Sequence, residues 1–135
     1  MKNIIKRRRG AAIIETPKGV LVCARKDSDF MIPGGGANFL ETRKRAAIRE
    51  VYEELGLKVK TSKYLFNYVG PVHRNKYGKL QQNFAKAFLV ITEGKPKPAN
   101  EINRIAYWKK GSKLKLMKAT KIVLDKYEKW RGEII

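Results

Sequence analysis

The chain has 135 residues, of which 43% are hydrophobic and one is a cysteine. We therefore expect one domain spanning residues 1–135, with a core that needs no disulfide. Its 31 lysines and arginines against 12 acidic residues give a net charge of +19, which favours polyanionic partners such as nucleotides or nucleic acid and is no evidence about the fold. We expect no transmembrane or secretory segment and no membrane partner. Cys23, the one cysteine, is expected to be buried in an apolar strand. Since a single cysteine forms no disulfide within the chain, we expect a cytoplasmic protein.

The N-terminal part predicts a β-hairpin preceded by a basic run. Lys6–Arg9 is either a solvated approach to the first strand or an arm that binds RNA. Apolar runs at Gly10–Ile14 and Gly19–Ala24 are separated by the polar residues Glu15–Lys18, which indicates two strands and a turn. Arg25 is expected to end the second strand.

Three consecutive glycines follow a short apolar segment. Residues 31–33 predict a short strand that leads into a loop of Gly34, Gly35 and Gly36. Glycines let the backbone approach a ligand closely and adopt positive φ without strain. Placed before a helix, such a loop can present backbone groups to a phosphate.

A helix is predicted after this loop, with Thr42 as its N-cap and Gly56 as the glycine that ends it. Glu50, Glu53 and Glu54 are spaced i, i+3 and i+4, so their carboxylates share one ridge of the helix. The apolar residues expected to face the core from other sides of the helix are Ala46, Ala47, Ile48, Val51 and Leu55.

Three carboxylates on one ridge repel each other and need a compensating positive charge. The candidates are Arg49 with nearby lysines, or hard divalent cations, which prefer oxygen ligands. A solvated acidic face is the alternative. Because this acid is concentrated in a chain with only 12 acidic residues, the pattern favours a metal site.

The rest of the chain predicts further strands and a second helix. The strands are expected at Lys58–Val69, Leu80–Thr92 and Ile102–Trp108, the loops at Val72–Gly78 and Gly94–Asn100, and the helix at Lys113–Trp130. No internal repeat or linker divides the chain. These elements predict an α+β fold with a mixed sheet.

The spacing of residues 35–57 resembles a known signature. Gly35 is followed after five residues by Glu41, and after seven more by Arg49-Glu50-Val51-Tyr52-Glu53-Glu54-Leu55-Gly56-Leu57. Every constrained position agrees with the signature box of the Nudix hydrolases. The resemblance implies an α/β/α sandwich with a mixed β-sheet, in which the box forms a loop-helix-loop. Many family members have glycine before the first box glutamate, where this chain has Leu40.

The resemblance also implies a function. Nudix hydrolases use Mg²⁺ or Mn²⁺ and water to cleave a pyrophosphate in a nucleoside diphosphate linked to another group. By this resemblance Glu50, Glu53 and Glu54 match the metal-binding glutamates. The Gly34 carbonyl matches a common backbone ligand.

Other residues receive supporting roles from the same resemblance. Arg49 corresponds to the arginine that orients the glutamates, and Glu41 to the residue that supports it. The catalytic base is expected to be Glu54 or Glu53. Glu101 is a candidate additional ligand or base, and Glu93 a weaker one.

Two glycines and one arginine are expected to contact the substrate. Gly35 and Gly36 are expected to approach it through their backbone. Arg25 stands where the family often places a phosphate-binding residue, although a surface arginine is an equal alternative. The lone His73 is expected to be a surface residue.

The substrate itself stays open at this point. The compact chain most resembles members that cleave nucleoside triphosphates, including oxidised ones. Pro71 lies near a proline of the ADP-ribose-cleaving members at an imperfect offset, and Tyr77 does not cleanly match the dinucleoside polyphosphate hydrolases. A Nudix-fold protein that binds RNA or processes its 5′ end is the alternative suggested by the charge, and a lysine-rich proteome is another explanation of that charge. A homodimer is possible.

Overall fold

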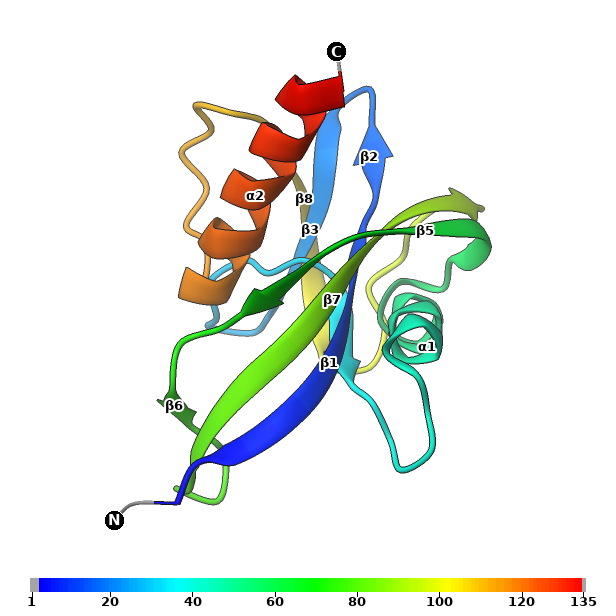
Figure 1. The fold of residues 1–135 in the computed structure, drawn as a ribbon. Helices are drawn as coiled ribbons and strands as arrows, with labels where there is room; N and C mark the ends of the chain where they lie inside the picture. The colour runs from blue at the N-terminus through cyan, green and yellow to red at the C-terminus, as the bar shows by residue number, and fades with distance from the viewer. Residues whose placement is uncertain (1–2, 135) are drawn as a thin grey trace.

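A computed structural model describes residues 3–134 and shows two β-sheets and two helices (Figure 1). The larger sheet has the strand order β4-β1-β7-β5, with β6 paired to β7. Strands β1 and β7 run parallel and their other pairings are antiparallel, so the expected mixed sheet is confirmed. Its strands are β1 (Ile5–Ile13), β4 (Gly34–Gly36), β5 (Lys58–Val69), β6 (His73–Arg74) and β7 (Leu80–Glu93).

The first strand begins earlier than the apolar pattern indicates. Lys6–Arg9 belongs to β1 and pairs in parallel register with residues 82–85 of β7. The prediction of a solvated approach before Gly10 was therefore wrong for this segment. Pairing with β7, and for Arg9 also with β4, holds these charged residues extended, independently of their hydropathy.

The smaller sheet consists of β2 (Glu15–Thr16), β3 (Gly19–Arg25) and β8 (Ile102–Trp108), in that order. The predicted hairpin is correct in position, but its paired strands are β2 and β3, so the turn contains only Pro17 and Lys18. Strand β1 joins the other sheet because its backbone is paired to β7.

The two helices cover different parts of the sheets (Figure 1). Helix α1 (Arg43–Leu55) buries Ala47, Val51 and Leu55 against a cluster that includes Ala12 and Phe88 of the larger sheet. Helix α2 (Lys118–Ile134) buries residues such as Val123 and Tyr127 in a second cluster with residues of both sheets. Helices on two sides of the β-structure match the expected α+β sandwich.

Helix α2 starts five residues later than predicted. The segment from Lys113 is extended up to Met117, because Leu116 forms an isolated parallel bridge with Phe30. The Phe30 N–H donates to the Lys115 carbonyl at 2.9 Å, and the Met117 N–H donates to the Phe30 carbonyl at 2.9 Å. A contact with a distant segment therefore replaces the first predicted turn and a half.

None of the helices in residues 3–134 is both long and apolar enough to cross a bilayer.

Candidate active site

The acidic ridge lies on α1, whose two ends form as the sequence predicts. The Thr42 hydroxyl accepts a hydrogen bond from the Arg45 N–H at 3.1 Å, and Gly56 ends the helix with φ of 68°. Between these ends the buried apolar side fixes the rotation of the helix. Glu50, Glu53 and Glu54 consequently lie along the edge of α1 that meets β4 and the loop before β8.

Glu54 is the buried member of this ridge, with 6% of its surface exposed. Its Oε1 accepts a hydrogen bond from the Gly34 N–H at 3.0 Å. Burial raises the pKa of the Glu54 carboxyl to about 7, and the neighbouring Glu50 charge adds to this rise, against the opposing effects of the Gly34 N–H and two arginines. A buried carboxylate in contact with the glycine strand was not foreseeable from helical spacing alone.

Arg49 forms hydrogen bonds with three carboxylates, those of Glu41, Glu50 and Glu53. Its guanidinium pairs with Glu41 through two bonds, Nε to Oε2 at 2.9 Å and Nη2 to Oε1 at 2.9 Å. Its Nη1 donates to Glu50 at 2.8 Å and to Glu53 at 3.2 Å. The remaining Nη2 contact reaches the Gly36 carbonyl at 3.0 Å. One planar cation therefore ties α1 to the loop and to β4.

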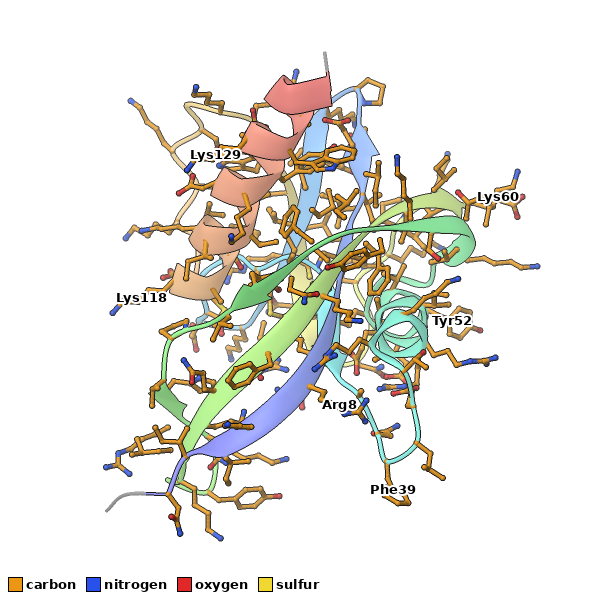
Figure 2. All side chains as sticks on the ribbon, viewed as in Figure 1. Arg8, Phe39, Tyr52, Lys60, Lys118 and Lys129 are labelled. Carbon is orange, nitrogen blue, oxygen red and sulfur yellow. The ribbon has the colours of Figure 1, made fainter. Side chains whose placement is uncertain are left out.

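The loop before α1 turns tightly around Glu41. The Glu41 N–H donates to the Asn38 carbonyl at 2.9 Å, and the Asn38 N–H donates to the Glu41 carboxylate at 3.0 Å. Arg8 extends from β1 to this loop and donates hydrogen bonds to the backbone carbonyls of Asn38 and Glu41 (Figure 2). Within the turn Leu40 has φ of 66°, a left-handed conformation that favours glycine. This conformation explains physically why a glycine would suit the position.

The three glycines form strand β4, so the predicted loop is instead paired to β1. Gly36, Gly35 and Gly34 stand opposite Arg9, Gly10 and Ala11 in antiparallel register. Sequence propensity disfavours glycine in strands, and only this non-local pairing makes the segment regular. A Cβ on Gly35 would lie 2.5 Å from the Glu50 carboxylate, so the absence of a side chain lets this carboxylate lie against the strand.

Arg25, the candidate phosphate-binding residue, contacts Glu101, the candidate additional metal ligand or base. Arg25 Nε lies 3.0 Å from Glu101 Oε2, and both side chains are exposed. Arg25 is still close enough to the acidic ridge for its charge to lower the pKa of Glu54, as a contribution smaller than burial. Glu93 lies at the end of β7 and pairs with Lys60 at 3.2 Å.

The carboxylates of the ridge suit a divalent cation by their chemistry, although they do not form a preassembled site. No three His, Cys, Asp or Glu side chains within residues 3–134 form a ready-made metal group, because Arg49 draws Glu50 and Glu53 toward itself while Glu54 faces Gly34. The chemistry nevertheless fits: all three donors are carboxylates, and the Glu50 charge raises the pKa of Glu54. Arg49 offsets the charges of Glu50 and Glu53, whereas Glu54 has no basic side chain bonded to it, and such oxygen-only donors suit a hard cation.

Two arginines of β1 also face the site, although the sequence pattern of their run indicates only a solvated approach or an RNA-binding arm. Arg7 and Arg9 are half-buried on the strand that pairs with β4 and β7. The Arg9 charge lowers the pKa of Glu54, and the Glu50 charge acts on Arg7. The alternation of the run Arg7-Arg8-Arg9 was the available signal, since it places the first and third on one face of a strand.

Other surface features lie away from this centre. A hollow of about 680 Å³ is lined by β2, β3, β8 and α2 residues such as Glu15, Trp108 and Arg131. A second, of about 500 Å³, is lined by Asn3, Ile5, Arg74, Lys79 and Leu80. Neither includes a residue of the acidic ridge. His73 lies in the short strand β6, partly exposed, with Nδ1 3.3 Å from the Pro71 carbonyl.

Comparisons with known proteins give one consistent fold. The sequence model of the NUDIX domain matches residues 6–135. A crystal structure of a protein described as a Nudix hydrolase family member from Chromobacterium violaceum is 37% identical, with a TM-score of 0.79, over 96% of this chain and 79% of that one. None of the curated proteins compared with the chain gives a match.

More distant structures support the fold alone. A MutT NUDIX hydrolase from Burkholderia pseudomallei is 24% identical with a TM-score of 0.73, covering 89% of this chain and 96% of that one. The NUDIX domain of Shewanella oneidensis NrtR, solved with ADP ribose, is 12% identical with a TM-score of 0.67, covering 96% of this chain and 89% of that one.

Proposed function

The chain belongs to the Nudix hydrolase family, and on this premise we propose that it cleaves the pyrophosphate of a nucleoside triphosphate or a related nucleotide, by attack of water and with Mg²⁺ or Mn²⁺. The observation that carries the proposal is the buried Glu54 beside Glu50, both against the glycine strand. Burying a carboxylate without a basic side chain bonded to it costs folding free energy, and groups of this kind are concentrated at functional sites.

The cation would be held by Glu50, Glu53 and Glu54, with the Gly34 carbonyl as a backbone ligand. A divalent cation supplies neutralisation of the pyrophosphate charge and activation of water. The hard, oxygen-only donor set is what supports this assignment.

Side chains of the protein would accept the proton, orient the carboxylates and contact the phosphate. In the reaction a water oxygen forms a bond to phosphorus, the bridging P–O bond breaks, and the water proton passes to a carboxylate, for which Glu54 and Glu53 are the candidates. Arg49 keeps Glu50 and Glu53 in fixed orientation, and its own position depends on Glu41. Arg25 would contact a phosphate at the edge of the site, in exchange for its exposed pair with Glu101.

The test is release of phosphate and nucleotide from a panel with Mg²⁺ or Mn²⁺. The panel contains normal and oxidised nucleoside triphosphates, ADP-ribose, a dinucleoside polyphosphate and a 5′-triphosphorylated RNA. We expect turnover of a nucleoside triphosphate that stops on addition of EDTA. No turnover of any panel member by folded protein would contradict the proposal.

A second candidate is a protein that binds RNA or processes its 5′ end, and the net charge of +19 favours it. The panel distinguishes the two, because preference for the RNA would assign the basic surface to the substrate. RNA binding without hydrolysis would indicate a binding module. Preference for ADP-ribose would indicate a pyrophosphatase of that substrate.

A further inference from the structure

Arg7 and Arg9 form a pair of cations on one face of β1. They are two residues apart in an extended strand, so their side chains point the same way and their Cα atoms are about 7 Å apart. Arg8, between them, points to the other side and binds the turn around Glu41. The Arg7 and Arg9 side chains therefore do not take part in the contacts with the Glu41 turn. They project from the opposite face of the sheet, from the strand between β4 and β7.

These two guanidinium groups have no carboxylate partner within the described residues. The ion pairs of arginine there involve Arg25, Arg49 and Arg131. The Arg9 Nη2 donates to the Ile32 carbonyl over a long distance of 3.5 Å, and the Arg9 side chain also lies within hydrogen-bonding reach of the buried Tyr68 hydroxyl. Glu50, whose charge acts on Arg7, already accepts a hydrogen bond from Arg49 at 2.8 Å. Glu50 and Glu54 act on this pair through their charges but form no ion pair with it, and half-buried cations without a directly bonded anion favour binding of one.

Arg7 lies close to several other charged groups. Burial lowers the pKa of the Arg7 guanidinium, and the charges of Arg9 and Arg25 lower it further while Glu50 opposes them. Three arginines therefore share one region at the edge of the acidic ridge. A Cβ on Gly36 would overlap the Arg7 guanidinium, so the glycine is what allows Arg7 to lie along β4.

A polar group beside Arg7 also has no partner. Asn83 stands opposite Arg7 in the parallel register, and its Oδ1 is buried without a hydrogen bond to any described residue. A bound ligand could donate to this oxygen, or the amide could turn its NH₂ toward an anion. The arginines without an ion pair and the amide oxygen without a hydrogen bond are independent observations about the same side of the sheet.

We propose that Arg7 and Arg9 form a subsite for a substrate phosphate beyond the two that flank the cleaved bond. This rests on the proposed function, and it narrows the substrate class to nucleotides with at least three linked phosphates. A two-phosphate substrate such as ADP-ribose would reach Arg25 and the acidic ridge but leave this pair without an anion.

The direct test measures binding of inorganic tripolyphosphate by calorimetry, with EDTA present so that no turnover occurs. We expect Arg7→Gln and Arg9→Gln each to weaken binding about tenfold, which corresponds to the loss of one charge-assisted hydrogen bond. The matched control is Lys6→Gln, which removes the same charge from the opposite face of the same strand, where Lys6 lies over the Phe84 ring. Its affinity should stay within about twofold.

Gly36→Ala provides a variant that keeps every charge. Its added methyl must displace the Arg7 guanidinium, so its affinity for tripolyphosphate should fall about as far as that of Arg7→Gln. Equal affinities for the wild type, Lys6→Gln, Arg7→Gln and Arg9→Gln would overturn the proposal, because general charge would then explain the binding.

Kinetics separate this proposal from the proposed function. Arg7→Gln should raise KM about tenfold for a nucleoside triphosphate and change KM for ADP-ribose by less than about twofold. Loss of tripolyphosphate binding in the variants of an enzyme that hydrolyses no nucleotide would support the subsite and contradict the function. Nucleotide hydrolysis together with unchanged tripolyphosphate binding in the variants would support the proposed function and contradict the subsite.

Discussion

The Arg49 guanidinium and the Glu41 carboxylate form a two-bond pair across the junction of the loop and α1, with both N···O distances at 2.9 Å. Glu41 also receives the Asn38 N–H, so the carboxylate joins the turn to the helix. Since Arg49 in turn contacts Glu50 and Glu53, the position of the acidic ridge depends on a residue eight positions before Arg49.

The first prediction concerns the pH dependence of stability at this pair. The hydrogen bonds from Arg49 and then from the Asn38 N–H lower the pKa of Glu41 from 4.5 to about 2. A lowered carboxyl pKa means that the stabilising effect is complete above about pH 4.5 and is lost as pH falls toward 2. Glu41→Gln should therefore be less stable than the wild type at neutral pH in urea denaturation, and the difference should shrink between these two pH values. A difference that is constant with pH would contradict this account.

The second prediction concerns the acidic ridge. Glu54→Gln and Glu53→Gln should each abolish metal-dependent turnover, because each removes a negative ligand while keeping the side-chain shape. Glu54→Gln should leave stability unchanged or higher, since it removes a charge that burial disfavours. The control is Glu93→Gln, which loses only the exposed pair with Lys60 and should keep full activity. Retained turnover in Glu53→Gln or Glu54→Gln would refute the metal assignment of that residue.

Local signals in the sequence were enough to predict α1 and its ridge. Thr42 and Gly56 mark the ends of the helix, and the spacing of Glu50, Glu53 and Glu54 needs only the helical period. Strands β5, β7 and β8 were also predicted to within a residue, because β7 contains an apolar run, β8 alternates between apolar and polar residues, and β5 is rich in strand-favouring residues.

The features that were missed depend on contacts between distant segments. The glycines become a strand only because β1 pairs with them, and Leu116 leaves the predicted helix because Phe30 pairs with it. Burial of Glu54 likewise depends on where β4 passes. Helical spacing gives the direction of a side chain, whereas its exposure depends on the tertiary structure.

The third prediction tests the close approach of β1 and α1. A Cβ on Gly10 would overlap the backbone carbonyl of Arg43, and backbone cannot move aside as a side-chain end can. Gly10→Ala should destabilise the protein by at least about 2 kcal/mol in urea denaturation. In contrast, Gly132→Ala in α2 meets nothing within 4 Å and should be neutral or stabilising by up to about 1 kcal/mol. Equal stabilities of the two variants would be inconsistent with this packing.

The fourth prediction concerns the single cysteine. Cys23 is fully buried, and burial, with a smaller contribution from Glu54, raises the pKa of its thiol to about 12. Because the thiolate is the reactive form, a maleimide or disulfide reagent at pH 8 should label native protein only at the rate of unfolding. Labelling should become rapid and stoichiometric in concentrated urea. Fast labelling of the native protein, at the rate of free glutathione, would show that the thiol is accessible.

The last prediction concerns the strained turn before α1. Leu40 adopts φ of 66° with 87% of its surface exposed, so its side chain gains little from packing while its backbone is in a conformation that costs roughly 1–2 kcal/mol for a non-glycine residue. Glycine removes that cost but adds entropy to the unfolded chain, an opposing effect of about 0.5–1 kcal/mol. Leu40→Gly should therefore leave the free energy of unfolding unchanged or raise it by up to about 1.5 kcal/mol.

The matched control is the neighbouring Phe39, which is 91% exposed and lies at the tip of the same loop (Figure 2). Phe39 is not among the residues with positive φ, so Phe39→Gly has only the entropic effect and should lower the free energy of unfolding by about 0.5–1 kcal/mol. The two substitutions thus remove similarly exposed side chains from adjacent positions and should differ in sign. If Leu40→Gly were destabilised as much as Phe39→Gly, the strain at Leu40 would be refuted.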